Sequence, residues 1–566
     1  MDSFSVLIGG KAGDGITEAG RMIGHVLNRL GYRLYQYVDS PSLIRGGHNV
    51  VIVRAHRQRV GAHRDHMNVL VALNQETIER HTWRLKDEPV IIYDSEVIDS
   101  ASLPPVARHL RTGVPIRTIL AEEEAPPVML NTAILGAFCK ALSIPWTVLE
   151  DVIVAYQHKK TELNLRVARR GYDLASEKLP IQRLGSEPLP ILNGLQAAGL
   201  GLVAGGLKAY AAYPMTPSSG LLHFLAEQAP RFELKVSQPE GEIAAMLMAL
   251  GHAYAGERVA VGTSGGGFSL MVEGLSLAGQ AELPIVIVLG QRTGPSTGLP
   301  TYTAQSDLEF AISAGQGEFP RAVIAPGDVE QAYAWSRLAL DLAWRYQLPV
   351  ILLGDRTLND NAQSFLTRAV PELPRLPQLD WDGAAMDPEP DLAYKRYALT
   401  EDGVSPLAFP GRAGAVVKVN SYTHDEWGIT TEDPGMTVQM QDKWLRKGRR
   451  MADELDTLPL VNVYGDPAAR RTVVTWGSPT GALREIGELA GVRIVQPVLL
   501  WPFPVRQLSE ALAGSERVAV AEVNATGQLA SLMERYGLRV DARLNRYDGR
   551  PWGVGELRRR VEEVLA

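Results

Sequence analysis

Residues 259–292 read VAVGTSGGGFSLMVEGLSLAGQAELPIVIVLGQR. The apolar run Val259–Gly262 has the length of a buried strand, and a glycine turn joins it to a helical pattern over Phe268–Ala281. A second apolar run, Ile285–Leu289, follows that helix. A strand, a helix and a second strand in this order predict a βαβ unit in a parallel sheet. Such sheets bind ligands at the carboxyl ends of their strands.

The same alternation of strands and helices continues on both sides of this stretch. Apolar runs predict further strands at Leu234–Ser237, Val323–Ala325 and Val350–Leu353, and helical spacing predicts helices over Gly241–Tyr254 and Val329–Tyr346. A second α/β block precedes residue 188, and a third, smaller one begins at Arg471. A proline-rich stretch lies between the last two blocks. We therefore expect a multi-domain α/β protein with a central doubly wound domain.

Four segments follow from these breaks in the pattern. They are an N-terminal α/β domain over 1–187, the doubly wound domain over 188–360, an extended connector over 361–470 and a C-terminal α/β domain over 471–566. A chain of 566 residues is also too long for one hydrophobic core, and its length alone predicts about three or four domains.

Composition excludes several classes of protein. A formal net charge of −7 gives no basic surface for nucleic acid. No apolar run reaches the ~18 residues that a membrane span needs, and the first residues lack the basic region of a signal peptide, so we expect a cytoplasmic protein. Cys139 is the single cysteine, whereas an iron–sulfur cluster needs about four thiolates. Any cluster used with this chain must lie on another subunit.

A glycine loop, GGKAGDG, follows the first predicted strand and spans residues 9–15. Loops of this kind expose backbone N–H groups to phosphates at a helix N-terminus. The dinucleotide fingerprint requires a third glycine at position 18, which is Glu18, although Asp39 stands where a ribose-binding acid would. Three interpretations remain open: a nicotinamide or flavin site, a tight turn without a ligand, and a site for another phosphate-bearing ligand such as coenzyme A.

Polar residues also follow the strands of the central domain. The prolines around Thr216 hold its hydroxyl at a strand end, although Ser218 or Ser219 could equally mark a helix N-cap there. Glu242 opens an apolar helix, a place where acids are also common for dipole reasons alone. Arg292 follows a buried strand and could bind a substrate carboxylate, or lie in an ordinary surface loop.

Three runs in the central block carry a family resemblance: AYPMTPSSG, EGEIAAMLMALGHAYAG and TSGGGFSLMVEGLSLAGQAELPIVIVLGQRTGPSTGLPT. In this order they resemble the α subunit of 2-oxoacid:ferredoxin oxidoreductases. The N-terminal runs GGKAGDGITEAG, SPSLIRGGHN and VLVALN are similar to the family's γ domain, fused ahead of α. The C-terminal runs TVVTWGSPTGALREI, LLWPFP and AEVNATGQLASLMERYG are similar to its transketolase-C-terminal-like domain.

The resemblance implies a thiamine-diphosphate enzyme with a divided active site. The central domain would be of the type that holds the aminopyrimidine, while a β subunit would hold the diphosphate, Mg²⁺ and a [4Fe-4S] cluster. The family's diphosphate motif is GDG followed by an asparagine, and the GDG at Gly13–Gly15 lies in the wrong domain and lacks that asparagine. The implied partners are the β subunit, ferredoxin, a 2-oxoacid and coenzyme A, in an (αβ)2 assembly. No metal ligand is expected on this chain.

The resemblance also assigns residues. Glu242 would face N1′ of the aminopyrimidine, with Glu240 as the competing candidate, and Thr216 and Arg292 would contact the 2-oxoacid. Further cofactor contacts would come from Tyr213, Pro214, Ser264 and Gly265. Coenzyme A contacts would come from Gly10, Gly13, Gly15 and Arg45. Two positions depart from the family pattern: Met215 replaces the usual isoleucine, and the loop over 263–267 has glycine where proline is commoner.

The implied substrate is 2-oxoglutarate, converted to succinyl-CoA and CO2, because the γ–α fusion resembles the 2-oxoglutarate enzymes. Pyruvate and branched-chain 2-oxoacids stay open. A diacid needs a second polar contact, for which His424, Arg45 and Lys418 are candidates. Two other classes also stay open, namely a nicotinamide-dependent oxidoreductase and a non-catalytic α/β assembly protein.

Overall fold

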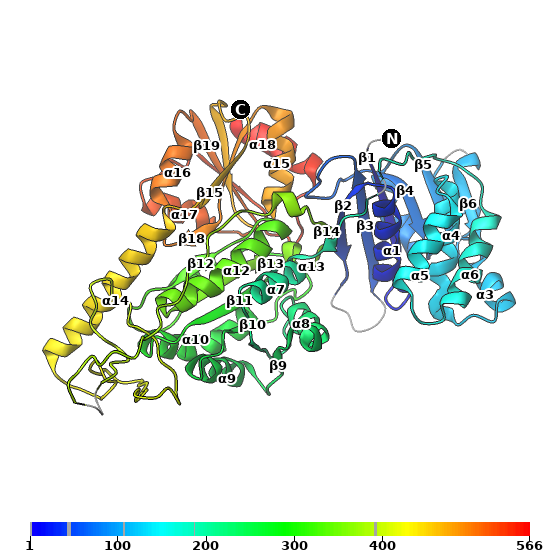
Figure 1. The fold of residues 1–566 in the computed structure, drawn as a ribbon. Coiled ribbons are helices and arrows are strands. Elements are labelled where there is room, and N and C mark those ends of the chain that lie inside the picture. Colours follow the sequence, from blue (N-terminus) through cyan, green and yellow to red (C-terminus); the bar gives the residue numbers. More distant parts are fainter. Residues whose placement is uncertain (1–2, 42–46, 106–107, 186, 390–392) are drawn as a thin grey trace. The chain divides into compact units, whose positions relative to one another are not determined.

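The computed structural model describes residues 3–41, 47–105, 108–185, 187–389 and 393–566. The chain forms two compact units (Figure 1). Unit 1 contains Met1–Leu192, Asn361–Leu366 and Trp552–Arg559, and unit 2 contains Asn193–Asp360, Thr367–Pro551 and Arg560–Ala566. None of the helices in the described ranges is long and apolar enough to cross a membrane.

Unit 1 is built on an eight-stranded mixed sheet with the order β6-β5-β4-β1-β3-β2-β14-β7. Its strands are β1 (Ser3–Lys11), β2 (Arg33–Asp39), β3 (His48–His56), β4 (Met67–Ala72), β5 (Leu85–Asp94), β6 (Arg111–Val114), β7 (Ile191–Leu192) and β14 (Gln363–Ser364). β1, β4, β5 and β6 are parallel, whereas β3 is antiparallel to both β1 and β2. Strand β14 comes from the predicted connector and extends this sheet at β2.

The helices of unit 1 are α1 (Ile16–Arg29), α2 (Gln75–His81), α3 (Ile116–Glu122), α4 (Leu130–Ala141), α5 (Trp146–Tyr156) and α6 (Thr161–Leu174). Helices α4 and α6 touch backbone to backbone. A Cβ on Gly136 would lie 1.9 Å from the carbonyl oxygen of Ala168, and one on Gly171 would lie 1.9 Å from that of Ala133. Cys139 is fully buried in α4, and this burial raises the pKa of its thiol.

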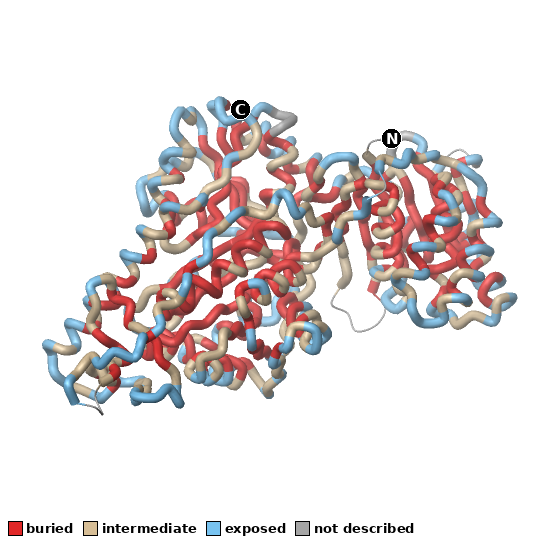
Figure 2. Tube along the Cα trace, in the orientation of Figure 1, coloured by how far each residue is buried: buried red, intermediate tan, exposed pale blue. Residues whose placement is uncertain are grey.

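Unit 2 contains the predicted doubly wound sheet, with the order β18-β12-β13-β11-β10-β8-β9. Its strands are β8 (Ala209–Ala211), β9 (Lys235–Ser237), β10 (Val259–Ser264), β11 (Ile285–Gln291), β12 (Ala322–Ile324), β13 (Pro349–Asp355) and β18 (Leu499–Trp501). All pairs are parallel except β12 with β18. The α/β prediction is thus confirmed, and Figure 2 shows the buried residues concentrated along these strands.

The helices that alternate along the chain with the strands of this sheet are α7 (Gly194–Ala204), α8 (Ser219–Phe232), α9 (Glu242–Tyr254), α10 (Gly265–Gln280), α11 (Leu308–Ser313), α12 (Val329–Tyr346) and α13 (Arg356–Asp360). A smaller sheet of unit 2 has the order β15-β17-β16-β19-β20. It contains β15 (Val461–Gly465), β16 (Arg471–Thr475), β17 (Arg493–Pro497), β19 (Arg517–Glu522) and β20 (Ala542–Asn545), with helices α15 (Pro479–Ala490), α16 (Val505–Leu512) and α17 (Gln528–Arg535). The last helix, α18 (Val554–Leu565), is divided: its residues up to Arg559 belong to unit 1 and those from Arg560 onward to unit 2.

The segment expected to be extended over 361–470 contains a 22-residue helix, α14 (Pro434–Leu455). Asp433 accepts a hydrogen bond from the backbone N–H of Met436, and Pro434 occupies the first turn, where its missing N–H costs nothing. The buried stripe of α14 includes Lys443 and Lys447, both hydrogen-bonded to the buried carboxylate of Glu282 at 2.6 Å. The helix is therefore fixed to unit 2 by a buried ion cluster as well as by apolar packing.

Candidate functional site

Parallel pairing brings the carboxyl ends of β8, β10 and β11 to one edge of the central sheet. Ala211 of β8 is in register with Val261 of β10, and Ser264 at the end of β10 is in register with Gly290 of β11. Ser237 at the end of β9 is in register with Ala211, and the segments that follow β8, β9 and β11 carry Thr216, Glu242 and Arg292. This is the edge where open parallel sheets bind their ligands.

Glu242 is the first residue of α9, and its side chain is 5% exposed. Its Oε1 atom has no hydrogen-bond partner in the described part of the chain. A Cβ on Gly267 would lie 2.7 Å from this oxygen and 2.1 Å from Oγ1 of Thr263. Glycine at 267 therefore lets the start of α10 close over the carboxyl group. A buried carboxyl with a free oxygen needs a donor from a ligand, because an unpaired buried polar atom is costly.

Thr216 and Arg292 meet at the same edge. The Nη1 atom of Arg292 donates a hydrogen bond to the backbone oxygen of Thr216 at 2.9 Å, which joins the loop after β8 to the end of β11. Ser218 is the N-cap residue of α8 but makes no capping hydrogen bond, and its hydroxyl donates instead to the backbone oxygen of Met215. Arg292 is thus anchored to the loop after β8 at the start of a largely exposed segment, and its substrate contact stays a prediction.

Sequence reasoning missed Asp307, which directly precedes α11. A Cβ on Gly265 would lie 2.8 Å and 3.0 Å from the two carboxylate oxygens of Asp307. Burial raises the pKa of Asp307 to about 6, and the nearby charge of Arg292 opposes this shift. The stretch TYTAQSDLEF carries no local signal for this environment, because it depends on α10 and β11.

The residues predicted to contact the cofactor differ in how far they are buried and in what they face. Ser264 is fully buried at the end of β10, and its hydroxyl has no hydrogen-bond partner among the described residues. Gly265 begins α10 and faces Asp307. Tyr213 is 39% exposed and follows β8 together with Pro214. Ser264 is thus another buried polar group at this edge that a ligand could satisfy, as is the Nε2 atom of Gln291 at the end of β11.

The glycine loop of unit 1 is a tight turn closed by Asp14. Its Oδ2 accepts from the backbone N–H of Lys11 at 2.8 Å. A Cβ on Gly10 would meet Ile16, and one on Gly15 would meet Asn131, both at 2.6 Å, so packing accounts for these two glycines. The surroundings of Gly13 are open. Arg45 lies outside the described residues, so these contacts stay predictions.

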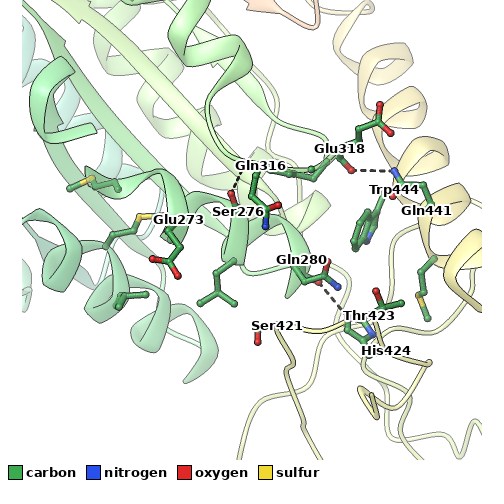
Figure 3. Close-up of a pocket in the computed structure, with 18 of the residues that line it drawn as sticks. Glu273, Ser276, Gln280, Gln316, Glu318, Ser421, Thr423, His424, Gln441 and Trp444 are labelled. Carbon is green, nitrogen blue, oxygen red and sulfur yellow. Dashed lines mark hydrogen bonds between the residues drawn. The ribbon is translucent and has the colours of Figure 1, made fainter. Parts of the chain in front are cut away.

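A groove of about 550 Å³ in unit 2 has Ile243, the residue after Glu242, in its lining. Figure 3 shows this groove, with Glu273, Gln280 and Trp444 among the labelled side chains. Helices α9, α10 and α14 line it together with residues 316–319 and 421–424. None of the described residues that line it is a lysine or arginine, so it does not suit a diphosphate. Its apolar rim includes Ile243, Leu247 and Leu270, whose side chains are 54%, 47% and 52% exposed.

His424 lies at this groove and not among the strand ends. Its Nδ1 faces the backbone oxygen of Asp425 at 3.0 Å, and its Nε2 faces that of Gln280 at 3.4 Å. Burial lowers the pKa of its imidazole, and the ring packs on Tyr397 with centroids 3.8 Å apart. These contacts give His424 a structural role that joins residues 421–424 to α10.

Two protein-family models match two different parts of this chain. Residues 201–442 match the family model described as "Pyruvate flavodoxin/ferredoxin oxidoreductase, thiamine diP-bdg", and residues 5–174 match "Pyruvate ferredoxin/flavodoxin oxidoreductase". A 2-oxoacid:ferredoxin oxidoreductase subunit alpha of Sulfolobus sp is 32% identical over 99% of this chain and 96% of its own length. A 2-oxoglutarate synthase subunit KorA of Methanothermobacter thermautotrophicus is 30% identical over 66% of this chain and 96% of its own length.

A solved structure has the same fold over the whole chain. It is a 2-oxoglutarate:ferredoxin oxidoreductase from Magnetococcus marinus with 2-oxoglutarate, coenzyme A and succinyl-CoA bound, with a TM-score of 0.88, 30% identity and full coverage of both chains. The resemblance found in the sequence is therefore confirmed. The chain belongs to the thiamine-diphosphate 2-oxoacid:ferredoxin oxidoreductases, as an alpha subunit.

Proposed function

We propose that this chain, together with a β subunit, oxidatively decarboxylates 2-oxoglutarate with coenzyme A to succinyl-CoA and CO2 and reduces ferredoxin. The observation that carries the proposal is the buried Glu242 carboxyl with a free Oε1, at the sheet edge that also holds Thr216 and Arg292. The choice of 2-oxoglutarate is supported by the relatives named for it, the KorA subunit and the Magnetococcus marinus enzyme.

Thiamine diphosphate, when bound, supplies the carbon nucleophile for the oxo group and accepts the electron pair left by CO2. The role of Glu242 is to hold a proton at N1′ of the aminopyrimidine. Its burial suits that role, because a hydrogen bond to the ring nitrogen is stronger away from water. The free Oε1 gives it a hydrogen-bonding position for the ring nitrogen.

Arg292 is the cation for the substrate carboxylate in this proposal. One N–H is used on the backbone of Thr216, and a guanidinium has further donors in a planar fork. The Thr216 hydroxyl lies next to that anchored backbone and can add a contact to the same anion. Together they fix the orientation of the 2-oxoacid, which is a large part of catalysis by positioning.

A β subunit completes the site. The exposed side chains of Ile243, Leu247 and Leu270 begin immediately beside Glu242 and support a protein partner there, since apolar patches of this kind are typical of interfaces. The chain's one cysteine cannot hold a cluster, so we assign the [4Fe-4S] centre to β. We assign Mg²⁺ and the diphosphate site to β as well, because the GDG at Gly13–Gly15 lacks the asparagine of the family's diphosphate motif. We further propose an (αβ)2 assembly and a coenzyme A contact at the glycine loop of unit 1.

The test is the reduction of a viologen dye by this chain with and without its β subunit, in the presence of thiamine diphosphate, Mg²⁺ and coenzyme A. We expect reduction only with β, only with coenzyme A, and faster with 2-oxoglutarate than with pyruvate or a branched-chain 2-oxoacid. Preference for one of the other acids would replace the substrate and keep the family. Turnover by the chain alone, or an inert complex with every 2-oxoacid, would contradict the divided site.

A further inference from the structure

The loop that carries Asp307 is held in place by the smaller sheet of unit 2. Gln305 accepts from the backbone N–H of Val523 at 2.8 Å and donates to the backbone oxygen of Trp476 at 2.7 Å. Gln528 donates to the backbone oxygen of Ser306 at 2.8 Å. The two residues before Asp307 are therefore fixed by these hydrogen bonds. The backbone N–H of Asp307 itself donates to the side-chain oxygen of Gln291 at 3.1 Å.

The Asp307 carboxyl has no role in capping the helix that follows it. Asp307 is the N-cap residue of α11, yet its side chain makes no capping hydrogen bond. The carboxyl lies instead against Gly265, at the first residue of α10. This places it at the sheet edge with Arg292 and away from its own helix.

Arg292 is the charged group acting on Asp307 among the described residues. The first turn of α10 is glycine, and α17 presents the neutral Gln528. Glu522 at the end of β19 is bonded to backbone N–H groups of its own domain. Arg292 is close enough for its charge to act on the Asp307 carboxyl, and one of its N–H groups is used on the backbone of Thr216, which leaves further donors of the guanidinium for an anion.

We propose that the Asp307 carboxylate takes up a proton from solvent when a 2-oxoacid anion binds at Arg292. The O–H of the protonated Asp307 then donates a hydrogen bond to that anion. This inference rests on the proposed function. An ionised Asp307 would repel an incoming carboxylate and compete for Arg292, whereas a protonated one removes the repulsion and adds a donor.

The linkage has a definite sign. Burial already raises the pKa of Asp307 to about 6 in the free protein, and a bound anion raises it further. Above that pKa, free Asp307 is ionised and must take up a proton on binding. Affinity for the 2-oxoacid then falls about tenfold for each pH unit until the pKa of the bound state is reached.

The experiment is calorimetry of 2-oxoglutarate binding to the complete complex at several values of pH, in two buffers with different heats of ionisation. We expect uptake of about one proton per site near pH 7 in the wild type. The variant Asp307→Asn should take up none and bind with an affinity that is flat with pH. Asp307→Ser, which keeps a short polar side chain but has no carboxyl group, provides a second variant. Glu309→Gln, at an exposed carboxylate in the same segment, is the matched control.

Proton uptake that disappears in Asp307→Asn and Asp307→Ser but persists in Glu309→Gln supports the proposal. Binding of 2-oxoglutarate without proton uptake, or uptake that survives both Asp307 variants, overturns it while the proposed function stands. No binding of any 2-oxoacid to the wild-type complex would overturn the proposed function and this inference with it.

Discussion

Gly267 lies so close to Glu242 that a single methyl group would not fit between them. The Cβ of an alanine at 267 would lie 2.7 Å from Oε1 and 2.8 Å from Cγ of Glu242. Glu242 is the first residue of α9, and Gly267 lies in the first turn of α10. The glycine therefore sets the position of the carboxyl group that we assign to the aminopyrimidine.

Gly267→Ala should displace Glu242 and lower kcat of the complex about 10²-fold, because a shift of about 1 Å in a reacting group has an effect of that size. The matched control is Gly266→Ala, since the only described atom near its Cβ is the backbone oxygen of Ser296 at 3.9 Å. Steady-state viologen reduction measures both variants. Equal rates for the two variants would show that Glu242 does not depend on Gly267.

Glu242→Gln should lower kcat about 10²–10⁴-fold, the range for removing a general acid–base group. Glutamine keeps the size of the side chain but cannot exchange a proton with N1′. Glu240→Gln is the control, because Glu240 is exposed and competes for the same role in the sequence. Complex formation with β should survive in both variants. A normal rate in Glu242→Gln with a slow Glu240→Gln would move the role to Glu240.

Local sequence signals were enough to predict the sheet edge. Glu242 opens a helix and Arg292 follows a strand that apolar periodicity reveals, whereas the signal for Thr216 is its two flanking prolines; parallel pairing then brings the segments together. The three-residue strand β8 was missed because so short a run carries too little pattern. Strand β18 joins the central sheet from far along the chain, which no local window can show.

Helix α14 and Asp307 were missed for a different reason. The buried stripe of α14 contains Lys443 and Lys447, which read as solvent-facing in the sequence. Their burial depends on Glu282, more than 160 positions earlier in the chain. Asp307 likewise acquires its environment from Gly265 and Arg292. Buried charges are set by tertiary partners, so sequence periodicity misplaces them.

Glu282→Gln should destabilise unit 2 by about 3–5 kcal/mol, the usual effect of removing one partner from a buried ion pair. Lys443 and Lys447 would lose the carboxylate that stabilises their charged forms, since all three side chains are fully or almost fully buried. Glu516→Gln removes an exposed pair with Arg470 and should cost at most about 1 kcal/mol. Calorimetric unfolding compares them, and similar losses of Tm would contradict the role of the cluster.

The buried cluster of Glu282, Lys443 and Lys447 also makes the stability of the protein depend on pH in the acid range. Lys443 and Lys447 hold the pKa of Glu282 below its usual range, against the effect of burial. Below about pH 4.3 the unfolded protein protonates Glu282, whereas the folded protein keeps it ionised. The contribution of Glu282 to the free energy of unfolding is therefore complete above that pH and decreases as the pH falls below it. Unfolding temperatures at pH 3.5–6 should fall more steeply in the wild type than in Glu282→Gln. Parallel curves would show that Glu282 is not linked to this acid loss.

Leu247→Arg should release the β subunit without unfolding this chain. Leu247 is 47% exposed on α9, on the same helix as Glu242 and at the rim of the groove. A charged side chain in an apolar interface should weaken binding by more than about tenfold, or 1.4 kcal/mol. Val128→Arg is the control, because Val128 is 66% exposed, belongs to unit 1 and is not among the residues that line this groove. Co-purification of tagged β, with circular dichroism of the free chain, measures the effect. If β is retained by Leu247→Arg and lost by Val128→Arg, the partner binds unit 1, and the apolar rim beside Glu242 has another occupant.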